Sequence, residues 1–231
     1  MIKVKLLSCT KDLEKVVASA ISQCYASKSA SEVFEKISEE RKSKLIQKVI
    51  SSGHHSTVEH ASFTFSAEGV SRVLTHELVR HRMASYSQQS QRYVKFKDAN
   101  FDYIIPPEIA KNEELKKEFE EKMTDLGGFY EKLIQAGIKP EDARFVLPNS
   151  TETKIVFTMN CRSLLNFFHL RMCTRAQWEI RSLATQVCQI CKKEAPSIFK
   201  DAGPTCISEK ICHEGSFSCG LWEKIPGAIL R

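Results

Sequence analysis

The stretch that decides the fold is Ala61-Ser62-Phe63-Thr64-Phe65-Ser66-Ala67. Its apolar and polar residues alternate. This period of two predicts a half-buried strand, because successive side chains of a strand point to opposite faces of a sheet. From Val70 to about Val79 the apolar residues return to the spacing of a helix. The sequence therefore predicts a strand that passes almost directly into a helix, and the other elements are placed around this pair.

Apolar periodicity predicts further strands and helices on both sides of that pair. Strands are expected at Val4–Leu7 and Thr153–Met159, and helices at Asp12–Gln23, Ser31–Ser51 (ending at Gly53), Leu115–Leu133 and Ile180–Cys191. We find no internal repeat, low-complexity tract or linker. The sequence thus predicts an α+β fold, one domain over residues 1–231 with a cysteine-rich tail at about 203–231. Long helices would cover a small, mainly antiparallel sheet.

Composition limits the class of protein and its location. The chain has 231 residues, of which 42% are hydrophobic, and it has no apolar run long enough for a membrane helix. Charged residues interrupt the first thirty positions, so we expect no secretory signal and a cytoplasmic location. The net charge of +6 suits an anionic partner such as a phosphorylated small molecule. The charge is spread along the chain, which weakens a nucleic-acid interpretation.

The most unusual stretch runs from Arg80 to Tyr93. It holds three arginines, one histidine, three serines and three glutamines, and it contains neither lysine nor glutamate. Such side chains supply many hydrogen-bond donors for phosphate and carbonyl oxygens. A solvated polar loop is the simpler alternative, but it has little use for so many serines and glutamines. We therefore interpret this stretch as a binding site.

This stretch also resembles a known family. Arg80-His81-Arg82, seven further residues and then Ser90 match the signature of the flavin-dependent thymidylate synthases. Four other blocks are similar to that family and stand in its order: residues 53–60, 143–148, 160–167 and 170–180. The resemblance thus spans roughly residues 53–180 and implies the fold of that family.

The resemblance implies reductive methylation of dUMP to dTMP. The family takes its carbon from 5,10-methylenetetrahydrofolate, releases tetrahydrofolate and uses FAD that NADPH has reduced. It builds its active sites at the subunit interfaces of a homotetramer. The partners expected from the resemblance are therefore dUMP, folate, NADPH and other copies of the chain, with neither nucleic acid nor a membrane.

The resemblance also assigns roles to individual residues. Those expected to bind FAD are His54, Ser56, Arg80, His81, Arg82, Gln88, Asn160, Arg162 and Asn166. Those expected to bind dUMP are Glu77, Arg80, Gln88, Gln89, Ser90, Gln91, Arg92, Arg144 and Arg171. The sequence departs from the common family pattern at Glu77, at Ser87-Gln88 and at Arg175.

Arg171 is the residue we expect to be catalytic. Carbon 5 of uracil becomes a better nucleophile as negative charge develops on the ring. A guanidinium directed at the ring stabilises that charge where it forms. Arginine suits this role because it stays cationic at any physiological pH.

Two other classes of function were weighed. The histidines between His54 and His81 suggest a metal-dependent phosphohydrolase, but they include neither His-Glu-x-x-His nor an i, i+4 histidine pair. No metal is therefore expected there. An RNA-binding module has only the charge and the arginine-rich stretch in its favour, with no RNA-binding motif.

The nine cysteines are expected to be free thiols, because no export signal is present. Cys188 and Cys191 form a C-x-x-C on the apolar face of a helix, which favours buried thiols over a redox site. Cys206, Cys212 and Cys219 lie close together in the tail. We expect free thiols there too, with a small metal site or a redox pair as the open alternatives.

Overall fold

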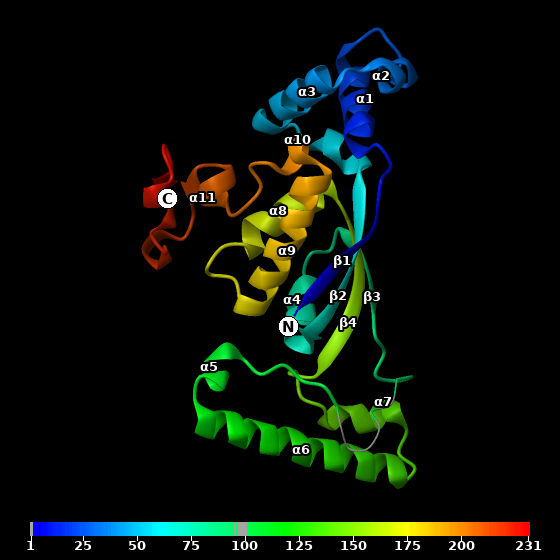
Figure 1. Cartoon of the computed structure of the whole chain (residues 1–231), viewed down its shortest axis with the longest axis vertical. Helices are drawn as coiled ribbons and strands as arrows, with labels where there is room; N and C mark the ends of the chain where they lie inside the picture. The colour runs from blue at the N-terminus through cyan, green and yellow to red at the C-terminus, as the bar shows by residue number, and fades with distance from the viewer. Residues whose placement is uncertain (1, 95, 97–100) are drawn as a thin grey trace. The chain divides into compact units, whose positions relative to one another are not determined.

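The computed structural model describes residues 2–94, 96 and 101–231 (Figure 1). The fold is α+β with a small antiparallel sheet, as predicted. The sheet has the strand order β1-β2-β4-β3. Its strands are β1 (Lys3–Cys9), β2 (Ser62–Ser71), β3 (Ala84–Gln88) and β4 (Glu152–Asn160). The strand predicted at residues 61–67 is thus confirmed as β2. It continues to Ser71, and its residues Phe63, Phe65 and Ala67 are completely buried.

The chain divides into two compact units that are interleaved along the sequence. The first unit contains residues 67–80 and 86–156 together with the start of the chain. The second contains residues 4–66, 81–85 and 157–231. Each unit is therefore built from stretches far apart in sequence. The single domain expected above stays a prediction.

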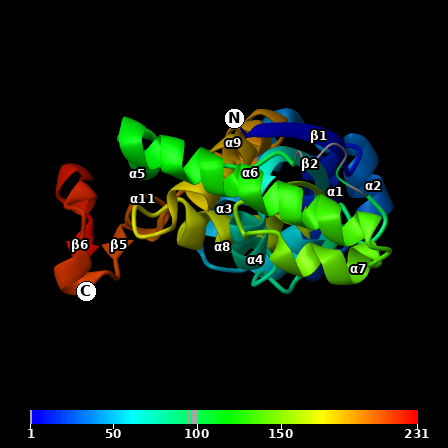
Figure 2. The same ribbon diagram turned by 90° about the horizontal axis from the view of Figure 1, so that it is seen from below.

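The first unit is dominated by α6 (Glu113–Gln135), which confirms the long amphipathic helix. Asn112 begins it, because its Oδ1 accepts hydrogen bonds from the backbone N–H groups of Glu114 and Leu115, each 3.1 Å away. In Figure 2, α7 lies beside the C-terminal part of α6, which it contacts. The other helical elements of this unit are α4 (Arg72–Leu78), α5 (Pro107–Ala110), α7 (Pro140–Ala143) and the 3-10 turn η2 (Arg144–Val146).

The second unit holds an aromatic core. Phe63 and Phe65 of β2 contact Phe199 and Phe157 respectively, and Phe168 also contacts Phe199. All five rings are fully buried. The helical elements around this core are α1 (Leu13–Tyr25), α2 (Ala30–Lys36), α3 (Glu39–Ser51), η1 (His55–His60), α8 (Cys161–Arg171), α9 (Trp178–Glu194) and α10 (Pro196–Phe199).

One helix prediction was wrong. Residues 31–51 form two helices, α2 and α3, because the chain leaves the helical conformation at Ile37. Ser38 then starts α3, and its hydroxyl accepts a hydrogen bond from the backbone N–H of Arg41. The predicted stop is confirmed, since Gly53 adopts a φ of 77°, which suits glycine.

The C-terminal tail contains little regular secondary structure. It contains α11 (Thr205–Ser208), η3 (Gly215–Phe217), η4 (Leu221–Lys224) and the parallel strand pair β5 (Ile211–Cys212) and β6 (Ile229–Leu230). Across the part of the chain that the structure describes, no helix combines the length and apolarity needed to cross a membrane.

A buried ionic contact joins three helices of the second unit. The Glu14 carboxylate of α1 accepts hydrogen bonds from the backbone N–H (2.7 Å) and hydroxyl (3.0 Å) of Ser197 in α10. The ammonium of Lys42 in α3 lies 3.4 Å from the same carboxylate. All three residues are buried. The Glu14 carboxylate therefore accepts two hydrogen bonds and pairs with one ammonium group in a largely buried position.

Replacing Glu14 by alanine should lower the free energy of unfolding by about 2 kcal/mol, because the two Ser197 donors lose their acceptor, while Lys42 keeps its ion pair with Glu39. Chemical denaturation would measure the loss. The matched control is Glu40→Ala, which removes an ion pair with Lys44 whose side chains are 78% and 76% exposed. That change should stay within about 0.5 kcal/mol. Equal effects of the two variants would contradict the role of the buried contact.

Candidate active site

Arg171 and His81 are in contact, although 90 positions separate them in the sequence. Arg171 is the last residue of α8, and its Nε donates a hydrogen bond to Nε2 of His81 at 3.0 Å. The imidazole packs edge-on against Phe167, with ring centroids 5.0 Å apart. The structure thus brings together the residue expected to be catalytic and the central histidine of the signature.

The imidazole of His81 is neutral at physiological pH. Burial and then the neighbouring Arg171 cation lower the pKa of His81 to about 4. Since Nε2 accepts from Arg171, the ring proton sits on Nδ1. The histidine therefore helps to orient the guanidinium by accepting its hydrogen bond.

One face of α8 presents the polar residues expected to bind the flavin. Asn160 starts the helix, and its Oδ1 accepts from the backbone N–H of Ser163 at 2.9 Å. Arg162 and Asn166 are one helical turn apart and exposed. Arg162 forms an ion pair with Glu59. This pair links α8 to η1, the element that packs beside it.

His54 and Ser56 lie at the start of η1, where both are exposed. The packing of η1 on α8 thus joins the residue 53–60 block to the residue 160–167 block within one unit. Arg82 belongs to the same unit and is exposed. These residues supply guanidinium, imidazole, hydroxyl and amide groups, which are the groups that hold a phosphate-containing cofactor.

In the first unit, the end of β3 is fixed by its polar side chains. The amide nitrogen of Gln88 donates to the hydroxyls of Thr75 (3.1 Å) and Thr153 (3.3 Å). Tyr86 donates its hydroxyl hydrogen to the carbonyl of Leu78 at 2.8 Å, and burial raises its pKa to about 12. The signature stretch is therefore partly a strand, which the sequence reading did not predict.

Arginines gather beyond the end of β3. Two nitrogens of Arg92 lie 3.0 and 2.8 Å from one carboxylate oxygen of Glu141. The Nε of Arg144 donates to the backbone carbonyl of the same Glu141 at 3.1 Å. Burial and the charge of Arg144 lower the pKa of Arg72, a third guanidinium in this region. Repelling cations of this kind favour an anion as their ligand.

Two residues of the signature point to a ligand at this place. Ser90 accepts a hydrogen bond from the backbone N–H of Arg92 at 3.1 Å, which forms a tight turn. The side-chain amide nitrogen of Gln91 is buried and has no hydrogen-bond partner within the described structure. A buried donor without an acceptor is costly, so this amide is suited to an oxygen supplied by a ligand.

The remaining predicted residues are spread over this unit. Glu77 is half-buried on α4, Arg80 is exposed just after it, and the backbone N–H of Gln89 donates to the carbonyl of Lys154 at 2.9 Å. Two residues in this region were missed by the sequence reading, Arg72 and Glu141. No motif marks either one, although Glu141 lies only three residues before Arg144.

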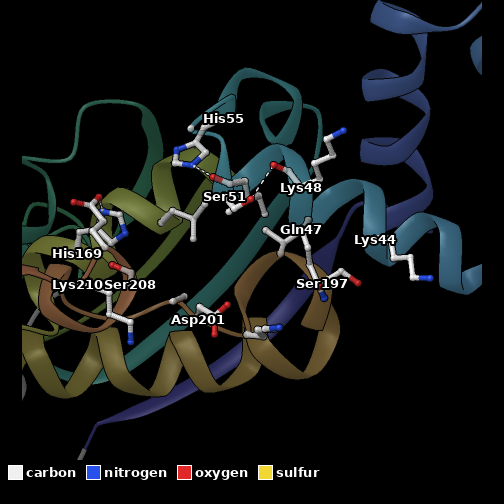
Figure 3. A pocket seen from close by; sticks show the side chains of 17 residues that line it. Lys44, Gln47, Lys48, Ser51, His55, His169, Ser197, Asp201, Ser208 and Lys210 are labelled. Atoms are coloured by element: carbon white, nitrogen blue, oxygen red, sulfur yellow. Dashed lines mark hydrogen bonds and ion pairs between the residues drawn. The ribbon is translucent and has the colours of Figure 1, made fainter. Parts of the chain in front are cut away.

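The second unit also contains a basic cavity of about 880 Å³ (Figure 3). Four lysines and two carboxylates contribute to its lining: Lys44, Lys48, Lys200, Lys210, Asp201 and Glu209. His55 and His169 also line it, and Nδ1 of His169 lies 3.3 Å from Glu209. These histidines are close in sequence to Ser56 and Asn166. The lysines carry no motif, so the sequence reading did not find them.

The metal-dependent alternative gains no support. Among residues 2–94, 96 and 101–231, no three His, Cys, Asp or Glu side chains are arranged to hold a metal ion. The histidines that suggested it fall into different settings. His81 contacts Arg171, whereas Nε2 of His55 lies 3.2 Å from the carbonyl of Ile50.

Clustered arginines beside an amide with no partner among the described residues in one unit, and an oriented arginine on α8 in the other, are features of an α+β protein that binds anionic ligands. A family model described as thymidylate synthase complementing protein matches residues 5–197, and the chain belongs to that family. The flavin-dependent thymidylate synthase of Clostridium tetani is 51% identical over 95% of this chain and 93% of its own length. Those of Geobacter sulfurreducens and Pyrococcus horikoshii are each 49% identical, over 94% and 93% of this chain and 94% and 90% of their own lengths.

Acid should destabilise the protein through His81. Below about pH 6.5 the unfolded chain takes up a proton on this residue, which the folded protein does not bind until about pH 4. Stability is therefore lost as the pH falls through this window. His81→Gln keeps an acceptor for Arg171 but cannot titrate. Between pH 7 and pH 5 it should lose about 1 kcal/mol less stability than the wild type, after allowing for solvent screening of a half-buried ring.

Chemical denaturation at the two pH values would measure the difference. A His81→Gln variant that loses as much stability as the wild type would contradict the neutral, buried imidazole.

Proposed function

We propose that this chain is a flavin-dependent thymidylate synthase that converts dUMP to dTMP. The observation that carries the proposal is the contact between Arg171 and His81, which belongs to the matched signature and holds a guanidinium at the end of α8. The family membership and the names of the relatives support the same activity. In the overall reaction, the uracil loses its hydrogen at carbon 5 and gains a methyl group there. The methylene comes from 5,10-methylenetetrahydrofolate and the hydride originates in NADPH.

FAD would be held by the polar groups of η1, α8 and the signature. The donor set suits it: His54 and Ser56 are exposed at the start of η1, and Arg162 and Asn166 are exposed on α8. Asn160 is committed to starting α8, so we expect its contact with the flavin to come from atoms other than the capping oxygen. When bound, FAD supplies the redox chemistry, and the protein orients and polarises the reactants.

The dUMP phosphate would bind among Ser90, Gln91, Arg92 and Arg144. In the structure, the guanidinium of Arg92 forms an ion pair with Glu141. The phosphate of dUMP would replace this carboxylate as the partner of Arg92. Gln91 supplies a buried amide nitrogen that needs an acceptor. From the resemblance to the family, we expect Arg171 to stabilise the negative charge that develops on the uracil when carbon 5 attacks.

We further propose that the active protein is a homotetramer with its sites at subunit interfaces. The exposed groups on α8 support this, because they would be completed by another copy of the chain. Light scattering during size-exclusion chromatography would test the tetramer. A monomer that turns over dUMP would contradict it.

The activity is tested by tritium release from dUMP labelled at carbon 5, in the presence of NADPH and methylenetetrahydrofolate. Protein stripped of flavin should release tritium only after FAD is added. Release without FAD would indicate the flavin-free route to dTMP, and no release from folded protein with FAD would contradict the proposed function.

Replacing Arg171 by alanine should slow this release at least 100-fold, since it removes the charge that stabilises the transition state. The matched control is Arg175→Ala, four residues further on, which should stay within a few-fold of the wild type. Circular dichroism and retained FAD would show that both variants fold. Equal rates in the two variants would contradict the role of Arg171.

Glu141→Gln should tighten dUMP binding several-fold, because Arg92 then no longer has a carboxylate partner that competes with phosphate. Calorimetric titration with dUMP would measure this. 2′-Deoxyuridine, which differs from dUMP only by lacking the phosphate, serves as the control ligand and should bind the variant and the wild type alike. Weaker dUMP binding in the variant would mean that Glu141 positions Arg92 instead of competing for it.

A further inference from the structure

The C-terminal tail is attached to the loop that follows Arg171. The Arg175 guanidinium lies over the ring of Phe217, 5.0 Å from its centre, and its Nε is 3.9 Å from the Glu214 carboxylate. The thiol of Cys173 donates to the other oxygen of Glu214 at 3.8 Å. All these residues belong to the second unit. Residues 214–219 of the tail therefore hold the loop at residues 173–175.

Four of the nine cysteines meet at this junction. A small cavity of about 30 Å³ is lined by Cys173 of the loop and by three tail residues, Cys206, Cys212 and Cys219. All four are free thiols. Thr174 also lines the cavity, and its side chain forms a hydrogen bond with Cys219. Cys219 therefore contacts the residue next to Cys173.

Three of these thiols differ in exposure and acidity. Cys219 is exposed, and hydrogen bonds from Thr174 and from the backbone of Leu221 lower its pKa in spite of the nearby Glu214. Burial is the main cause of a raised pKa at Cys173 and at Cys206. An exposed thiol of lowered pKa beside a thiol of raised pKa is the arrangement of a peroxide-reactive cysteine and its resolving partner.

We propose that Cys219 and Cys173 form a redox-sensitive thiol pair, in which a hydroperoxide oxidises Cys219 and Cys173 resolves it as a disulfide. The Cys219 thiolate attacks hydrogen peroxide, breaks the O–O bond and becomes a sulfenic acid, while hydroxide leaves. The sulfur of Cys173 then attacks the sulfenic sulfur and displaces a second hydroxide. The Cys173 proton passes to the Glu214 carboxylate and from there to hydroxide. The proton that Cys219 lost on ionisation converts the first hydroxide to water. In sum, two thiols and one peroxide give one disulfide and two waters.

The disulfide would join the tail to a position two residues after Arg171. The loop that follows α8 would then be covalently fixed to residues 214–219. The effect on catalysis, which rests on the proposed function, is a lower rate of dUMP turnover, because the end of α8 can no longer adjust to the substrate. The disulfide itself does not depend on that function.

The test uses the full-length protein, treated with hydrogen peroxide and then alkylated. We expect the count of reactive thiols in denatured protein to fall from nine to seven, and mass spectrometry to find the peptides of Cys173 and Cys219 joined with the loss of two hydrogens. Cys219→Ser should abolish both changes. Cys24→Ser, which removes an exposed thiol far away in the sequence, should leave them intact.

Three results would contradict the proposed thiol pair of Cys219 and Cys173. They are a full count of nine thiols after peroxide, a joined peptide that contains Cys206 or Cys212 in place of Cys173, and one equivalent of zinc or iron in the freshly purified protein. Because these are counts of thiols, peptides and metal, they stand whether or not the protein methylates dUMP. Dithiothreitol should return the oxidised protein to nine thiols.

Discussion

The burial of Phe167 and Phe168, two residues of α8, is the constraint on which the proposed site depends. Phe168 contacts Phe199 in the aromatic core, and Phe167 packs against the ring of His81. Both rings are fully buried, so α8 cannot turn about its axis without exposing them. The direction of Arg171 follows from this packing. A core that fixes the roll of one helix thus also fixes the position of a cation at its end.

The two units hold their arginines in different ways. In the second unit, Arg171 donates a hydrogen bond to the imidazole of His81, which burial and the arginine itself keep neutral. In the first unit, Arg92 forms a half-exposed ion pair with Glu141, which is weak enough for a phosphate to replace. Both contacts orient a guanidinium, and the partner of Arg92 can be exchanged for an anionic ligand.

Patterns local in sequence predicted much of the fold. The alternation at residues 61–67 and the apolar stripe of α6 were sufficient, because each element is defined by its own period. The break between α2 and α3 was missed although Ser38 is a good cap, since the apolar spacing continues across it. The strand β3 was missed because its alternation, Ala84-Ser85-Tyr86-Ser87, is short and lies within a polar stretch that was interpreted only as a binding site.

The residues of the candidate site were predicted mainly from the family signature, and only in part from the chemistry of their side chains. Residue types identified the signature, but no local pattern could pair Arg171 with His81, since tertiary packing alone creates that contact. Glu141 was missed for the same reason.

The interleaved second unit also sets an order of events during synthesis. Phe63 of its core is 136 positions before Phe199, the ring that it contacts. At about 5–20 residues per second, a ribosome needs on the order of ten seconds to make the chain between them. For that time Phe63 of β2 lacks this partner. A nascent chain of this kind is exposed to aggregation early, and chaperones that bind extended apolar segments would protect it until α10 emerges.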